Sequence, residues 1–361
     1  MILHIFNPEH DIALASNLAH FTAPHAGRQL RADLCFLPAL WASSGDAILV
    51  DDASYAAKAY HRFTGATKLV KKDVKWVTRH DLVQLELASI EPWGWDAALR
   101  HSLVRYGIPL SQLPTLDEID EIRWLSHRAR IIEIQKQLVD GEQFIGESVY
   151  SHNLDEIEEK LQQYRQIVLK APWSSSGRGV RFVQGALTVS QQGWLNNLLK
   201  LQGGVMVEPY YNKVKDLGME FESDAKGHVR FCGLSLFHTA NGAYTGNVLA
   251  TEAAKMELLS HYVSKELIEH TKEKLCSLTG ALFNGRYQGP FGVDMMICAS
   301  QDKHRGMANK KGFLLHPCVE INLRRTMGHV ALSVSPDSDD VKKVMRITME
   351  GSNYKLRIRK L

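Results

Sequence analysis

Two apolar, β-prone runs near the C-terminus each contain an acidic residue, and they constrain how this part of the chain can fold. The first run, 289–298, contains Asp294, and the second, 314–324, contains Glu320. Between them lies the polar, glycine-containing segment 299–311, which is typical of the loop of an antiparallel hairpin. Pairing Asp294 with Glu320 centres the turn inside that loop. The sequence therefore predicts a hairpin in this register.

The predicted hairpin gathers three oxygen-bearing side chains on one face of a sheet. Glu320 and Asn322 are two residues apart, so they share a face, and Asp294 faces them across the ladder. Two carboxylates this close repel each other unless a cation lies between them. Oxygen ligands completed by water and phosphate suit Mg²⁺ better than zinc. The pattern predicts a magnesium site, and the alternative is a solvated sheet face that binds nothing.

A second segment combines a strand, a lysine and a loop of small residues. A strand that begins near Ile167 ends at Lys170, and the Ser/Gly-rich loop 174–179 leads into a return strand. Backbone N–H groups in such a loop can surround phosphate oxygens, and the lysine supplies a positive charge. The spacing matches neither a Walker A loop nor a dinucleotide-binding fingerprint. The segment therefore indicates phosphate binding, with an ordinary glycine-rich hairpin as the alternative.

Further along, a strand that ends at an acid precedes an extended connector and a second acid. Glu208 ends the strand, Tyr210 and Tyr211 lie in the connector, and Asp216 leads the next strand. The backbone of such a connector can contact the edge of an adenine, and the acid that follows can bind a ribose hydroxyl. This pattern indicates nucleotide binding.

Taken in this order, the segments resemble the ATP-grasp superfamily over about residues 120–335. The resemblance implies an α/β (α+β) chain in which an ATP-grasp fold follows a Rossmann-like open-sheet domain. It assigns nucleotide binding to Lys170, Ser174, Ser175, Ser176, Gly177, Glu208, Tyr210, Tyr211 and Asp216. It assigns the metal to Asp294, Glu320 and Asn322, and Arg324 completes a Glu-x-Asn-x-Arg pattern.

Many members of the superfamily have another basic residue, before the glycine-rich loop, that contacts the nucleotide phosphates. In this chain the candidates are Arg128 and Arg130, which follow Ser126, a candidate helix N-cap. Arginine is chemically suited to phosphate. The alternative is that both arginines lie in a solvated first turn of a helix.

The resemblance further implies an ATP- and Mg²⁺-dependent ligase that joins a carboxylate to an amine or a thiol through an acyl phosphate, with Mn²⁺ as an alternative metal. Lys170 would neutralise the phosphates, and Arg324 would stabilise the transferred phosphoryl group or the oxyanion. The substrates would be small-molecule or peptide acids and amines. The alternatives are a phosphotransferase acting on a small alcohol, and an ATP-binding protein without catalysis.

Composition agrees with a soluble enzyme. With 361 residues, 45% of them hydrophobic, the chain can bury large cores, and we expect domains at 1–120 (Rossmann-like), 121–202 (the small subdomain with the loop) and 203–361 (the large subdomain with the metal site). The net charge of +3 gives no reason to expect nucleic acid or membrane partners. Five cysteines without CxxC spacing indicate reduced thiols. The first residues do not resemble a signal peptide and no apolar run is long enough to span a membrane, so we expect a cytoplasmic protein.

Periodicity predicts the remaining elements. We expect strands at 2–6, 47–50 and within 69–77, helices at 55–63, 81–87, 128–139, 154–164 and near 257–278, a linker at 113–122 and a basic edge strand at 355–360. Two segments are candidates for the acceptor site. The first is the turn after the first strand, with Asn7, Glu9, His10 and Asp11, and the second is a loop between strand and helix with His238, Tyr244 and Asn247. An ordinary turn and a plain surface loop are the alternatives.

Overall fold

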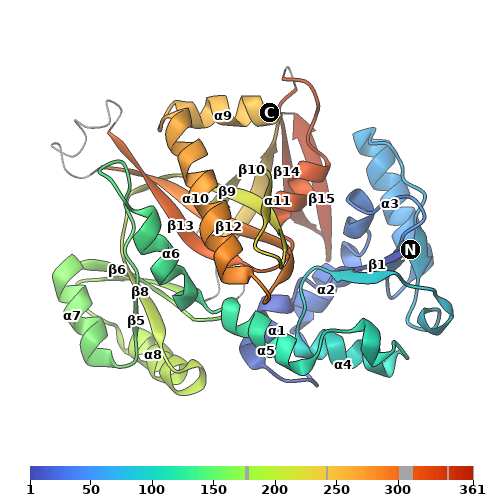
Figure 1. The fold of residues 1–361 in the computed structure, drawn as a ribbon, viewed down its shortest axis with the longest axis horizontal. Coiled ribbons are helices and arrows are strands. Elements are labelled where there is room, and N and C mark those ends of the chain that lie inside the picture. The colour runs from blue at the N-terminus through green and yellow to red at the C-terminus, as the bar shows by residue number, and fades with distance from the viewer. Residues whose placement is uncertain (175–178, 241–242, 301–311, 340, 361) are drawn as a thin grey trace. The chain divides into compact units, whose positions relative to one another are not determined.

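The computed structural model describes residues 1–174, 179–240, 243–300, 312–339 and 341–360, which form two compact units (Figure 1). Unit 1 consists of Met1–Arg123, Thr245–Thr251 and Arg324–Leu361, and unit 2 consists of Trp124–Tyr244 and Glu252–Leu323. Each unit therefore combines segments that lie far apart in the sequence.

Unit 1 contains a parallel sheet of four strands in the order β3-β2-β1-β4. The strands are β1 (Ile2–Ile5), β2 (Ala47–Leu49), β3 (Lys75–Val77) and β4 (Ser89–Pro92). One face packs with Leu103 of α4 (Ala97–Arg105), and the other packs with Tyr60 of α3 (Ala53–Thr67). Both faces are covered, so the strands are short and mainly apolar, although His4 lies in β1, Lys75 in β3 and Glu91 in β4. The chain passes from β1 to β2 and β3 on one side, and β4 lies on the other, so the order of the strands reverses between β1 and β4.

The other elements of unit 1 come from both ends of the chain. They are α1 (His10–Ser16), α2 (His25–Asp33), η1 (Leu37–Leu40), η2 (Leu82–Gln84), η3 (Leu110–Gln112), α11 (Met327–Ser333), β14 (Lys343–Glu350) and β15 (Asn353–Lys360). The strand β11 (Ala243–Leu249) pairs with β14 through Asn247 to Leu249. The buried Asp33 of α2 accepts hydrogen bonds from the side chain of Asn353 at 2.8 Å and from the backbone of Tyr354 at 2.7 Å. This carboxylate ties the first part of the chain to its last strand.

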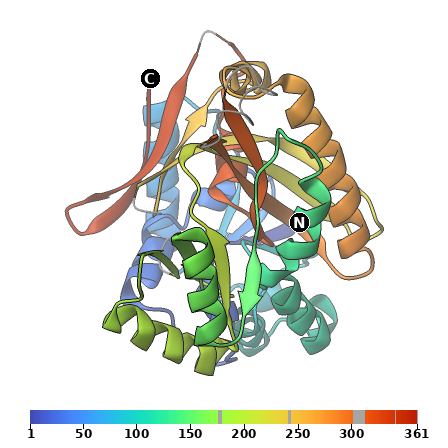
Figure 2. The same ribbon diagram turned by 90° about the vertical axis from the view of Figure 1, so that its left-hand side faces the viewer.

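Unit 2 begins with a small antiparallel sheet in the order β5-β8-β6-β7. Its strands are β5 (Val149–Ser151), β6 (Gln166–Lys170), β7 (Val180–Gln184) and β8 (Val205–Pro209). The helices α7 (Leu154–Tyr164) and α8 (Val189–Gln202) lie on one face (Figure 2). Alternate residues of the strands, such as Ile167, Leu169 and Val207, point into the core beneath these helices. The residues between them therefore face away from this core.

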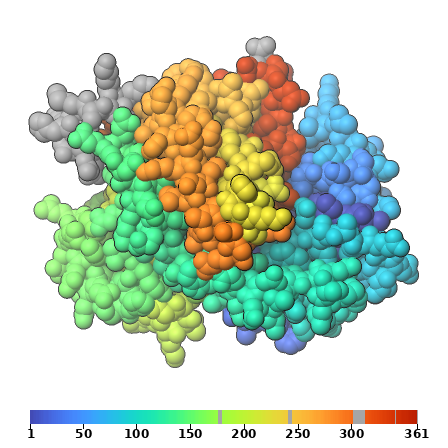
Figure 3. Space-filling view, viewed as in Figure 1, coloured from blue at the N-terminus to red at the C-terminus, as the bar shows by residue number. Residues whose placement is uncertain are grey.

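The large sheet of unit 2 has the order β13-β12-β9-β10. Its strands are β9 (Lys213–Asp224), β10 (Val229–Ala240), β12 (Gln288–Ala299) and β13 (Phe313–Asn322). The helices η4 (Arg128–Arg130), α6 (Ile131–Leu138), α9 (Glu252–Ser260) and α10 (Lys265–Phe283) complete the unit. Phe283 of α10 packs on Phe291, which stacks on Phe221, so α10 covers one face of the sheet and itself lies at the surface (Figure 3).

Several predicted elements are confirmed. The hairpin has the predicted register, with Asp294 opposite Glu320, and the register shifts between Asp294 and Met296. The turn itself lies outside the described residues. The helix at 154–164 and the final strand at the end of a sheet are also confirmed.

Two predicted elements are wrong. The segment 113–122, expected to be a linker, mostly forms the helix α5 (Leu116–Leu125). Thr115 and Glu118 form reciprocal hydrogen bonds at its start, so the Thr-x-x-Glu pattern that begins helices was present in the sequence. The expected helix at 81–87 is only the short turn η2. Within the described part of the chain, no helix has the length and apolar character needed to cross a membrane.

Candidate functional site

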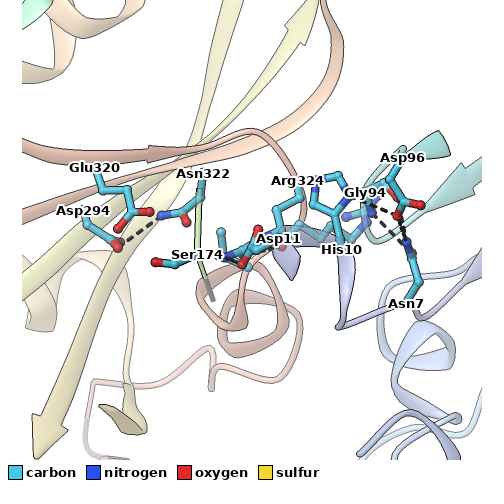
Figure 4. A network of polar contacts seen from close by, with 12 residues as sticks. Asn7, His10, Asp11, Gly94, Asp96, Ser174, Asp294, Glu320, Asn322 and Arg324 are labelled. Atoms are coloured by element: carbon cyan, nitrogen blue, oxygen red, sulfur yellow. Dashed lines mark hydrogen bonds and ion pairs between the residues drawn. The ribbon is translucent and has the colours of Figure 1, made fainter. Parts of the chain in front are cut away.

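The strands β12 and β13 place the two predicted acids directly opposite each other. Asp294 pairs with Glu320 and Gly292 pairs with Asn322, so the acids and Asn322 share one face of the large sheet. The side-chain amide of Asn322 donates a hydrogen bond to Asp294 Oδ2 at 3.1 Å (Figure 4). The described residues contain no group of three or more His, Cys, Asp or Glu side chains that could hold a metal ion. The candidate ligands are therefore two carboxylates and one amide, all oxygen donors suited to Mg²⁺.

A buried arginine connects these ligands to the start of the small-residue loop. Arg128 is 6% exposed, and its Nη2 lies 2.7 Å from Glu320 Oε1. Its Nη1 donates a hydrogen bond to Ser174 Oγ at 2.7 Å and another to the carbonyl of Ala171. Arg128 is thus not part of a solvated helical turn. Its positively charged guanidinium contacts both a candidate metal ligand, Glu320, and the first residue of the loop, Ser174.

Lys170 lies at the end of β6, as predicted, and forms an ion pair with Glu208 of β8. Its Nζ is 2.6 Å from Glu208 Oε2, and the two side chains are only 10% and 3% exposed. The sequence analysis assigned Lys170 and Glu208 to separate contacts with a nucleotide. In the structure the two side chains form an ion pair with each other across the neighbouring strands β6 and β8. Ser174 lies beside Arg128, but Ser175, Ser176 and Gly177 are outside the described residues.

The face of the small sheet away from α7 and α8 carries several of the remaining candidates. Val168 pairs with Phe182 on one side and with Glu208 on the other, which places these three side chains on that face. Phe182 is 55% exposed and Tyr210 is 43% exposed, and their ring centroids lie 6.1 Å apart. This face therefore presents aromatic surface close to a buried ion pair.

Asp216 and Tyr211 are held by neighbours of different character. The Asp216 carboxylate accepts hydrogen bonds from Lys213 Nζ at 2.8 Å and from Thr239 Oγ1 at 2.7 Å. The Tyr211 ring meets His316 edge-on, with ring centroids 5.5 Å apart. Burial, followed by the negative charges of Glu147 and Glu208, raises the pKa of the Tyr211 phenol.

Sequence reasoning missed His316. This residue of β13 is fully buried, and its Nε2 lies 3.4 Å from the side-chain amide of Gln135. Burial, and secondarily the positive charge of Lys170, lowers the pKa of His316 to about 3, so the ring is neutral at physiological pH. The signal was a single histidine inside an apolar strand, at the same period of two as Glu320.

In unit 1, the turn after β1 meets the turn after β4. The Asn7 amide donates hydrogen bonds to the Gly94 carbonyl at 2.8 Å and to Asp96 Oδ2 at 3.2 Å. His10 is 1% exposed, and its Nδ1 lies 3.4 Å from Asp96 Oδ2 (Figure 4). A Cβ on Gly94 would lie 2.7 Å from the His10 ring, so only glycine fits here. These polar residues lie at the carboxyl ends of β1 and β4, where the order of the strands reverses.

Arg324 also belongs to unit 1, where it forms a bidentate ion pair with Asp11. Its Nε and Nη2 lie 2.7 Å and 2.8 Å from the two carboxylate oxygens of Asp11. The nearby Glu9 pairs with Arg31, and burial raises the pKa of Glu9. The turn after β1 is therefore a network of paired charges.

The second acceptor candidate has a different local structure from the one expected. His238 lies on β10, and Tyr244 and Asn247 lie on β11, so the segment is mainly two strands rather than a loop between strand and helix. Alternating β-branched and aromatic residues, including Phe237 and Thr239, favour strands here despite the glycines.

The contact between the two ends of the loop, Ser174 and Gly179, provides a testable point. A Cβ on Gly179 would lie 2.2 Å from Ser174 Oγ and 3.0 Å from the Cβ of Ala171. Gly179→Ala should therefore displace the residues that contact Arg128 and lower the single-turnover rate with ATP by about 10- to 100-fold, more than it weakens ATP binding. Gly193→Ala is the matched control, because nothing lies within 4 Å of its added methyl group. Equal losses of affinity and rate in Gly179→Ala would mean that this part of the chain only binds nucleotide.

Neither protein-family models nor curated proteins match the sequence. Solved structures do match the fold. The biotin carboxylase domain of Hydrogenobacter thermophilus 2-oxoglutarate carboxylase has a TM-score of 0.51 at 13% identity, over 96% of this chain and 74% of that one. N5-carboxyaminoimidazole synthetase from Staphylococcus aureus gives 0.47 at 11% identity (96% and 82%), and a putative ATP-grasp superfamily protein from Archaeoglobus fulgidus gives 0.48 at 10% identity (100% and 99%). The chain has the ATP-grasp fold.

Proposed function

We propose that this protein is an ATP- and Mg²⁺-dependent ligase that joins a carboxylate to an amine or a thiol through an acyl phosphate. One observation carries the proposal: the buried guanidinium of Arg128 joins Glu320, beside Asp294 and Asn322, to Ser174 at the start of the small-residue loop. The proposed phosphate-binding and metal-binding groups thus lie close together inside unit 2. A protein that only binds ATP has less need of this metal-ligand set.

In this proposal Asp294, Glu320 and Asn322 hold Mg²⁺. The residues fit the ion, because two carboxylates and one side-chain amide offer oxygen donors on one face of the sheet. When bound, Mg²⁺ would neutralise negative charge on the phosphates. The solved biotin carboxylase domain of Hydrogenobacter thermophilus was crystallised with MgADP and bicarbonate, which supports the same nucleotide and metal here.

The chain's own residues then position the nucleotide and its phosphates. Lys170 and Arg128 supply positive charge to the phosphates, and Ser174 to Gly177 surround them. Glu208, Tyr210 and Tyr211 contact the base, and Asp216 binds the ribose. Arg324, already oriented by Asp11, stabilises the transferred phosphoryl group or the oxyanion.

The proposal requires tight MgATP binding. ATP at 100 times its dissociation constant should raise the free energy of unfolding by about 2.7 kcal/mol, with a smaller gain when Mg²⁺ is left out. Calorimetric titration and thermal unfolding with ATP alone, Mg²⁺ alone and both together measure this effect. No affinity for ATP in millimolar Mg²⁺ would contradict the proposed function.

Hydroxylamine distinguishes a ligase from a phosphotransferase. It attacks acyl phosphates without needing the natural amine, so a panel of amino acids, dicarboxylic acids and short peptides can be screened with ATP, Mg²⁺ and hydroxylamine. A ligase forms a hydroxamate and releases ADP and phosphate with its acid substrate. A phosphotransferase instead retains the phosphate on its product, and that result would replace the ligase proposal.

A further inference from the structure

The site face of the large sheet is ordered in rows that run across its strands. Residues paired on neighbouring strands share a face, so each row can be followed from strand to strand. The first row is Met296 and Asp216; the second is Glu320, Asp294, Gly218 and Ser235; the third is Asn322, Gly292, Glu220 and Gly233. Glu220, which the sequence analysis did not single out, therefore lies on the same face as the candidate metal ligands.

The three rows follow one another along strand β9. Along β9, Asp216, Gly218 and Glu220 are two residues apart, so successive rows are separated by about 6.8 Å. Asp216 is the candidate for the ribose and the second row holds both carboxylates of the metal set. Glu220 lies in the row beyond them, on the side away from Asp216. A group that receives the activated carboxylate must lie on that side, because the transferred phosphate is the end of ATP farthest from its ribose.

The surroundings of Glu220 suit a ligand. Its partners in the third row are Gly292 on one strand and Gly233 on the other, so no side chain of either neighbour covers the carboxylate within the row. Glu220 is nevertheless only 3% exposed. Burial, and secondarily the negative charge of Glu220, raises the pKa of the nearby Tyr244 phenol.

Glu222 shows what an ordinary acid on this strand looks like. It lies two residues further along β9, on the same face, with a side chain that is 49% exposed and paired with Arg230. Burying a carboxylate is costly, whereas exposing one is not. The difference in exposure places Glu220 inside the fold, whereas Glu222 lies at its surface.

We propose that Glu220 binds the positively charged amine of the acceptor and so selects an amine over a thiol or an alcohol. This inference rests on the proposed ligase function. The ammonium group loses one proton to water, and the free amine attacks the carbonyl carbon of the acyl phosphate. The C–N bond forms, the C–O bond to phosphate breaks, and phosphate leaves with the second proton. Glu220 binds the ammonium form before this proton is lost, so it favours an acceptor that arrives positively charged over one that arrives neutral.

The experiment compares Glu220→Gln with wild type, using Glu222→Gln as the matched control. The acid is the one that gives a hydroxamate in the panel described above, and the amines are the common amino acids and simple primary amines. Hydroxylamine is largely neutral at pH 7, so hydroxamate formation should stay within about twofold in Glu220→Gln. Coupling to the amine should fall at least about tenfold, mainly through a higher KM for the amine, and Glu220→Asp should recover part of it.

Three measurements make the outcomes distinct. MgATP affinity and thermal unfolding should be the same in all variants, which establishes that the fold and nucleotide site are intact. Unchanged amine coupling in Glu220→Gln, or equal losses with hydroxylamine and amine, would overturn the amine site while leaving the ligase proposal standing. No hydroxamate from wild type with any acid would overturn the ligase proposal and the amine site together.

Discussion

Glu320→Gln is expected to lower turnover by about 10³-fold while the protein stays folded. The substitution keeps the shape of the side chain but removes one of the two negative charges of the candidate metal site. Gln can still accept the hydrogen bond that Arg128 donates to Glu320 at 2.7 Å, so the buried guanidinium keeps a partner. Single-turnover rates in a titration with Mg²⁺ measure the effect, and raised Mg²⁺ should recover part of the loss.

Glu133→Gln is the control for this variant. Glu133 is 75% exposed and pairs with Lys136 on the surface, so its replacement should leave turnover and stability unchanged. Asp294→Asn should act like Glu320→Gln, with a smaller loss if Asp294 contacts a single metal ion. Full activity in Glu320→Gln would show that the hairpin is structural.

Lys170→Ala is expected to lower both stability and ATP affinity, for two separate reasons. It leaves Glu208 buried without its counter-charge, and breaking a buried ion pair from one side costs about 3–5 kcal/mol. It also removes a positive charge from the proposed phosphate site, which should weaken ATP binding by at least about tenfold. Chemical denaturation and calorimetry measure the two effects separately.

A double variant separates these two roles. Lys170→Met combined with Glu208→Gln removes both charges at similar volume, so much of the lost stability should return. ATP affinity should not return, because the phosphates still lack the lysine. Recovery of both properties in the double variant would mean that Lys170 serves only to balance Glu208.

The part of the site that could be predicted from the sequence depends on local periodicity. The pairing of Asp294 with Glu320 followed from two strands joined by one loop, and the structure has this register. The shared face of Glu320 and Asn322 follows from the same period of two. Such relations need only two neighbouring strands, whereas the register shift between Asp294 and Met296 was not predicted.

What could not be predicted depends on contacts between distant residues. Arg128 and Glu320 are separated by 192 positions, and Asp11 and Arg324 by 313. No pattern in either local segment specifies its partner. Glu220 was overlooked for a related reason: its burial comes from the whole fold, while in the sequence it resembles the exposed Glu222 two residues away. The helix at Leu116–Leu125, in contrast, had a local signal at Thr115 and Glu118 that the proline before them obscured.

The link between Asp33 and the last strand has a consequence for how the chain is made. The partners of this buried carboxylate, Asn353 and Tyr354, lie 320 and 321 positions later. At typical elongation rates, the ribosome needs roughly 16–64 s to add that many residues. Unit 2 ends at Leu323, so all of its residues emerge before the last segment of unit 1. During translation, residues 1–123 must wait for a partner that is synthesised after unit 2, while the unit that carries the proposed nucleotide site has its whole sequence available earlier.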